Sequence, residues 1–148
     1  MKPGIMSINY SEEKLNKIKE FFKADIFAAD TGAVIDSVGA GCAVCSLKIN
    51  SRHYNAGGGV QGGVIFTLAD FTFAVAANSG GNLTVSLSNN ITFLRPPKSD
   101  TIKAEAKLIS ETKHTCLYEV NVTDSESEGS PVAVMTVNGY KKSVPIEF

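Results

Sequence analysis

HYNAGGGVQGGVIFTLADFTFAVAANS, residues 53–79, decides the fold of this chain. A polar loop with five glycines between positions 57 and 63 runs directly into an apolar segment. That segment, residues 64–77, is too long for a typical strand, so we predict a helix over residues 62–79. Because this helix is apolar on almost every side, it must be buried on most of its circumference. Across residues 53–94, Asp70 is the only acid and no Lys or Arg occurs.

The flanking segments predict one further helix and a sheet. Ser11, followed by two acids, is a typical helix start, and apolar residues then recur at helical spacing, so we expect a helix over residues 11–23. Residues 25–32 are expected to be a loop or irregular, and residues 124–130 a polar turn. Alternating or β-branched patterns predict strands over residues 33–38, 42–49, 83–94, 102–110, 115–123 and 132–141.

Short polar links between these strands predict an antiparallel meander. One apolar helix among about six strands is covered best when a curved sheet wraps around it. The expected fold class is therefore α+β, with a curved antiparallel sheet, one long central helix and an N-terminal helix, in a single domain over residues 1–148. This outline resembles the hotdog fold.

Composition excludes several classes of protein. The chain has 148 residues, a formal net charge of -1 and 20% charged residues, so a nucleic-acid partner is not expected. The longest apolar run is too short to span a membrane and contains Asp70, and residues 1–7 lack the apolar core of a signal peptide, so we expect a cytoplasmic protein. Cys42 and Cys45 have CxxC spacing, but no second pair or His cluster accompanies them, so no metal site is expected.

The loop and the acid carry the candidate chemistry. Unpaired N–H groups at a helix start bind anions or polarise a carbonyl, although glycines there can simply permit a tight turn. Asp70 is either exposed to solvent or a general base or nucleophile in an apolar cleft. Gly63 lies seven residues before Asp70, roughly 10 Å along the axis, which is too far for both groups to act on one carbonyl. If both are catalytic, a second copy of the chain must supply one of them.

The motifs resemble those of hotdog acyl-CoA thioesterases of the phenylacetate-pathway (PaaI-like) type. The resemblance implies hydrolysis of an acyl-coenzyme A, without metal or redox cofactor, in a homodimer or a dimer of dimers. It implies Asp70 as base or nucleophile, Gly62 as a carbonyl-polarising N–H from the facing subunit, Asn55 near the attacking water, and Ser86 as a helper. The matching residues are His53-x-Asn55, Gly62-Gly63-x-x-Phe66-x-Leu68-Ala69-Asp70, Ala76-x-Asn78-Ser79 and Asn90-Ile91-Thr92-Phe93-Leu94-Arg95-Pro96.

One position departs from the family pattern. The family motif begins His-Gly-Gly, whereas this chain has Gln61, which forms hydrogen bonds but does not titrate near neutral pH. Activity survives this change if the family His only orients the loop or the substrate. The alternatives are therefore a non-catalytic acyl-CoA-binding protein and, less in keeping with the residues, a hotdog dehydratase.

Further residues are candidates for substrate binding. Gln61, Gly63 and His53 belong to the loop and the helix start. The apolar candidates for an acyl pocket could equally be core, and the basic candidates for the coenzyme A phosphates could equally be solvated surface. These candidates are Leu68, Phe71, Thr72 and Val75 for the acyl group, and Arg95, Lys98, Lys113 and His114 for the phosphates.

Overall fold

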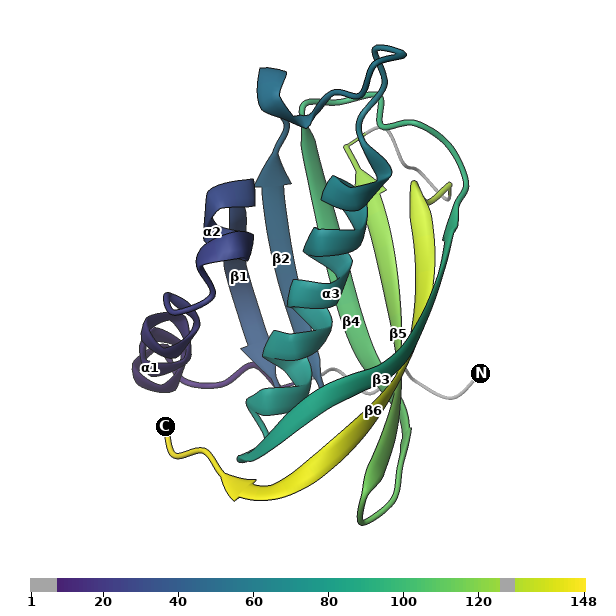
Figure 1. The fold of residues 1–148 in the computed structure, drawn as a ribbon. Helices are drawn as coiled ribbons and strands as arrows, with labels where there is room; N and C mark the ends of the chain where they lie inside the picture. The colour runs from purple at the N-terminus through teal and green to yellow at the C-terminus, as the bar shows by residue number, and fades with distance from the viewer. Residues whose placement is uncertain (1–7, 126–129) are drawn as a thin grey trace.

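A computed structural model describes residues 8–125 and 130–148 of the chain (Figure 1). The expected polar turn at 124–130 and the N-terminal residues 1–7 therefore lie partly or wholly outside the described residues. The elements in chain order are α1 (Glu12–Phe22), α2 (Ile26–Thr31), β1 (Ala33–Gly39), β2 (Cys42–Lys48), the 3-10 helix η1 (Ser51–His53), α3 (Gly62–Asn78), β3 (Asn82–Phe93), β4 (Thr101–Glu111), β5 (Thr115–Asp124) and β6 (Ala133–Pro145).

The six strands form one antiparallel sheet that curves around α3, as the hotdog outline predicts (Figure 1). Their order is β1-β2-β4-β5-β6-β3, so the prediction of a simple meander is wrong for β3, which pairs with β6 at the sheet edge. Three strand spacings of about 4.8 Å separate β3 from β4. The link at residues 94–100 can bridge that gap of roughly 15 Å, because an extended chain covers about 3.3 Å per residue.

The central helix is held by its apolar contacts with the concave face of the sheet. Leu68, Ala69 and Val75 are fully buried, and they belong to the same core as Val120 and Val137 from β5 and β6. Burial of each large aliphatic side chain contributes about 1.5–3 kcal/mol. The helix therefore has little freedom to slide, and this fixes the position of every polar group that it carries.

The helix ends agree closely with the sequence. The expected helix at 62–79 is α3, with Gln61 as N-cap and Ser79 as C-cap. The expected helix at 11–23 is α1, whose N-cap Ser11 accepts a hydrogen bond from the Lys14 N–H. The C-cap Ser79 of α3 is right-handed, and the positive φ after the helix occurs at Gly81.

The segment predicted to be irregular contains the short helix α2. Asp25 caps it by accepting a hydrogen bond from the Ala28 N–H at 3.0 Å, and Gly32 ends it with a φ of 105°. Six residues give too few turns for a helical period to be read from sequence. This short helix matters for the site, because α2 lies beside α3 (Figure 1) and forms one wall of the cavity described below.

Two further features concern the classes of protein considered above. Within the described ranges, no helix is long and apolar enough to cross a membrane.

The two cysteines with CxxC spacing are strand residues: Cys42 is half-buried and Cys45 is buried on β2. Among the described residues, no group of three or more His, Cys, Asp or Glu side chains could hold a metal ion.

Candidate active site

The loop before α3 is anchored by His53. Its side chain is buried, with Nδ1 accepting a hydrogen bond from the Asn50 N–H at 3.1 Å and Nε2 donating to the Thr31 carbonyl at 2.7 Å. Both ring nitrogens are therefore occupied, and the ring joins η1 to the end of α2. A contact of His53 with substrate stays a prediction, and the contacts that the ring makes here position the loop.

The glycine-rich loop is shaped by Asn55. Its Oδ1 accepts hydrogen bonds from the N–H groups of Gly57 at 2.9 Å and Gly59 at 3.1 Å. Gly58 between them has a φ of +83°, a conformation that side chains disfavour. The Asn55 side chain is exposed, and its Nδ2 has no acceptor within residues 8–125 and 130–148. The amide N–H groups of Asn55 thus remain available beside the start of α3.

The start of α3 leaves one backbone donor unpaired. The Gln61 Oε1 accepts a hydrogen bond from the Gly63 N–H, whereas the Gly62 N–H has no acceptor in the described part of the chain. The Phe93 ring covers Gly62 so closely that a Cβ there would lie 3.2 Å from its Cζ. A helix start carries partial positive charge, so this donor suits an oxygen that becomes negative.

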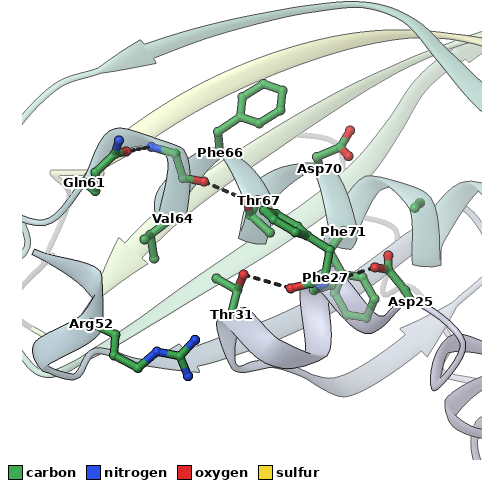
Figure 2. Close-up of a pocket in the computed structure, with 13 residues that line it drawn as sticks. Asp25, Phe27, Thr31, Arg52, Gln61, Val64, Phe66, Thr67, Asp70 and Phe71 are labelled. Carbon is green, nitrogen blue, oxygen red and sulfur yellow. Dashed lines mark hydrogen bonds between the residues drawn. The ribbon is translucent and has the colours of Figure 1, made fainter. Parts of the chain in front are cut away.

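A cavity of about 620 Å³ lies between α2 and α3 and reaches Asp70 (Figure 2). Figure 2 shows the Asp70 carboxylate and the Phe66 ring on one side of α3, whereas Val64 and Phe71 point toward α2. The cavity is largely apolar with a few polar groups, which is typical of a small-molecule site. Its lining residues are Asp25, Phe27, Ala28, Thr31, Arg52, Gln61, Gly63, Val64, Phe66, Thr67, Asp70, Phe71 and Ala74.

Asp70 is half-buried, and its surroundings favour the protonated form. Burial raises the pKa of its carboxyl group above the usual range, and the nearby charge of Asp25 raises it further. A hydrogen bond with the Asn89 side chain acts in the opposite direction and lowers the pKa. A carboxylate with a raised pKa is a stronger base than an exposed one, so Asp70 is suited to accept a proton in this cavity.

Several predicted residues meet here, and others do not. Gln61, Gly63, Asp70 and Phe71 line the cavity. Leu68, Thr72 and Val75, which were predicted for the acyl pocket, are fully buried and do not line this cavity. Ser86 is exposed on β3 and does not line the cavity.

The basic candidates are separated from one another. Arg95, predicted as a phosphate ligand, pairs its guanidinium with the buried Asp124 carboxylate at 2.8 Å. Lys98 precedes β4, whereas Lys113 and His114 follow it, so the 11 residues of that strand hold the two groups roughly 35 Å apart. Lys98 therefore cannot bind the same phosphate as Lys113 or His114 within one subunit.

The sequence analysis missed four residues near the site. Asp25 and Phe27 line the cavity because α2 forms one of its walls, and α2 was not predicted; Arg52 lines it from η1. Asn89, whose side chain lowers the pKa of Asp70, belongs to β3, and the place of β3 beyond β6 was not predicted. The sequence offered no signal for Arg52, because it lies just before the range 53–94 on which the site prediction was based.

Comparison with known proteins defines the class. Residues 57–130 match the thioesterase superfamily family model, and the chain belongs to that superfamily. It is a PaaI-like hotdog thioesterase, that is, a thioester hydrolase. It is 32% identical over 108 residues to the acyl-coenzyme A thioesterase PaaI of Escherichia coli, covering 72% of this chain and 77% of that one.

Solved structures agree with this assignment. The structure of the Escherichia coli PaaI protein from the phenylacetic acid degradation operon superposes with a TM-score of 0.84 at 27% identity, covering 93% of this chain and 99% of that one. A hypothetical thioesterase from Streptococcus pneumoniae, solved with coenzyme A, gives a TM-score of 0.73 at 25% identity, with 82% and 96% covered.

Proposed function

We propose that this protein hydrolyses acyl-coenzyme A thioesters to a free acid and coenzyme A, with Asp70 as general base or nucleophile. The observation that carries the proposal is a half-buried carboxylate of raised pKa in an apolar cavity on the same helix as an unpaired N–H. The names of the Escherichia coli relative and of the Streptococcus pneumoniae structure with coenzyme A support the choice of thioester.

The chemistry requires a polarised carbonyl and a proton acceptor. The Gly62 N–H donates a hydrogen bond to the thioester oxygen, which becomes negative when the carbonyl carbon is attacked. Asp70 removes a proton from water as the water oxygen bonds to that carbon. When the carbon–sulfur bond breaks, the thiolate takes the proton from Asp70, and the carboxylate is restored. In the nucleophilic variant, Asp70 attacks first and water then cleaves the resulting anhydride.

The spacing of these two groups along α3 supports a site that is shared between two subunits. Gly62 and Asp70 are roughly 12 Å apart along α3, so one carbonyl cannot contact both within one chain. The edge strand β3 has 12 residues, and its outer edge pairs with no strand among the described residues. The side chains of Leu87 and Phe93 on this strand are also exposed. A long strand edge with unpaired backbone groups and exposed apolar side chains is normally covered by another part of the protein or by a partner.

We therefore infer a two-fold dimer in which two β3 edges meet and two α3 helices run antiparallel. Each Gly62 N–H then lies beside the partner subunit's Asp70, which gives two equal sites. Asn55, at the loop before the same helix start, has free amide N–H groups for the thioester or the water. A dimer of dimers would keep these sites intact.

Gln61 is compatible with catalysis. Its Oε1 supplies the hydrogen-bond acceptor that the Gly63 N–H requires, and this role needs no charge. Gln61 lines the cavity, and its Nε2 has no acceptor among the described residues, so it can donate to substrate. This observation argues against the alternative of a non-catalytic acyl-CoA-binding protein, whose only specific support is the absence of a histidine at this position.

Thiol release from a panel of aromatic and aliphatic acyl-CoAs tests the proposal. We expect turnover by the wild type and a loss of at least about a hundredfold in Asp70→Asn. Asp36→Asn is a matched control, because Asp36 is exposed on β1 and bonded only to Ser46. Full turnover in Asp70→Asn would exclude Asp70 as the base, and tight binding without release by the wild type would favour the binding protein.

A further inference from the structure

A second apolar cavity lies behind the candidate site. It has a volume of about 360 Å³ and lies between α1, α2 and β1, which are all on one side of α3 (Figure 1). Phe22 of α1 and Val34 and Ile35 of β1 line it. The polar side chains in its lining are Lys19 and Lys23, both exposed, and lysine stems cover apolar surface while their amines stay in water. We call it the outer cavity, and the cavity that reaches Asp70 the inner cavity.

The side chain of Phe71 separates the two cavities. Phe71 is the one residue that the two linings share. Its side chain is 6% exposed and points from α3 toward α2 (Figure 2). Its ring packs edge-to-face on Phe22, with the ring centroids 5.6 Å apart, and this arrangement stabilises aromatic pairs. The inner cavity therefore ends at a ring that is held in place from behind.

We propose that Phe71 limits the length of the acyl group, and that the outer cavity is an apolar compartment for the distal carbons of a straight acyl chain, closed off by the Phe71 ring. Phe71 follows Asp70 directly, so an acyl group whose carbonyl carbon lies at Asp70 extends along this ring. The proposal rests on the proposed function, because it assumes that the inner cavity holds the acyl group of a thioester. It names aliphatic chains short enough to end at Phe71 as the favoured substrates.

Burial of methylene groups gives this proposal a measurable form. Each methylene that moves from water into an apolar cavity strengthens binding roughly fourfold. In the wild type, kcat/KM should rise with chain length and then level off or fall where the chain meets the ring. Without the ring, the outer cavity of about 360 Å³ opens to the inner cavity of about 620 Å³. The rise should then continue to longer chains.

The test measures kcat/KM of the full chain with hexanoyl-, decanoyl- and dodecanoyl-CoA. We expect the dodecanoyl-to-hexanoyl ratio to increase at least about tenfold in Phe71→Ala, and less in Phe71→Leu, which keeps more of the packing. Phe73→Leu is the matched control, because Phe73 is also buried on α3 and packs edge-to-face on Tyr118 but lines neither cavity. Its ratio should equal that of the wild type. A ratio compares two substrates of one variant, so a general loss of turnover cancels.

Equilibrium binding keeps this test separate from the proposed function. S-Hexyl-, S-decyl- and S-dodecyl-coenzyme A are thioethers without a carbonyl, and calorimetry measures their Kd even in a protein that releases no thiol. The dodecyl thioether should gain affinity over the hexyl thioether in the Phe71 variants. An unmoved ratio of Kd values in folded Phe71→Leu and Phe71→Ala would overturn the proposal. An equal gain in Phe73→Leu would attribute the effect to looser packing of α3 and would overturn it as well.

Discussion

The Gln61 side-chain oxygen accepts a hydrogen bond from the Gly63 N–H at the start of α3, and the Gly62 N–H beside it has no acceptor among the described residues. One side chain thus completes the helix cap without covering the donor assigned to the thioester oxygen. The departure of this chain from the family's His-Gly-Gly pattern is therefore chemically conservative at the helix start.

Replacing Gln61 tests this view of the cap. Gln61→Ala should lower stability by about 0.5–2 kcal/mol, because an N-cap acceptor is lost, and thermal unfolding measures the change. Gln61→His, whose neutral ring nitrogen can also accept, should keep the activity within a few-fold. A large loss of activity in Gln61→His with normal stability would mean that the Gln61 amide N–H, and not its oxygen, is the group that matters.

Gly62→Ala should damage the site sterically while it keeps the N–H. The added Cβ would lie 3.2 Å from the Phe93 Cζ, so the ring or the helix start must shift by a few tenths of an ångström. We expect reduced kcat in Gly62→Ala and partial recovery in Gly62→Ala with Phe93→Leu, measured by thiol release. Additive losses in the double variant would contradict the contact.

The raised pKa of Asp70 predicts that this group destabilises the fold at neutral pH. A carboxyl whose pKa is higher when folded binds more protons folded than unfolded, so its contribution to stability falls as the pH rises from its ordinary value near 3.8 through the raised value. Asp70→Asn should therefore have a higher Tm than the wild type at pH 7. The difference should shrink below pH 4, and equal Tm differences at both pH values would argue against a raised pKa.

Arg95 is predicted to matter for stability and not for binding. Asp124 is fully buried, and Arg95→Met would leave its carboxylate without the guanidinium, which costs about 3–5 kcal/mol. Thermal unfolding should report the loss, while the KM of the folded enzyme for acyl-CoA stays unchanged. Lys98→Met, at an exposed position nearby, is the comparison for a pure charge effect. A raised KM in Arg95→Met alone would restore Arg95 as a phosphate ligand.

The sequence predicted those elements that depend on neighbouring residues. The central helix followed from the length of one apolar run and the glycine-rich loop before it. The pairing of β3 with β6 could not be predicted, because it depends on contacts between residues 40 to 63 positions apart, from Phe93–Ala133 to Asn82–Pro145. The same limit applies to the partner of Arg95, which lies 29 residues away. The helix α2 was missed because six residues carry too little periodicity.

The central claim is that each active site combines Asp70 of one subunit with the Gly62 N–H of the other. Gly62→Pro removes that N–H at the first helical position, where proline is tolerated, and Asp70→Asn removes the base. Each variant alone should be inactive as a homodimer. A heterodimer of the two, co-expressed with different tags and purified on both, contains one site with both defects and one site with none.

The most direct measurement is the rate of thiol release by that heterodimer. Our account predicts about half of the wild-type rate per dimer, because one of its two sites is intact. A heterodimer that is no more active than its inactive parents would show that both groups act within one subunit, and it would contradict the account.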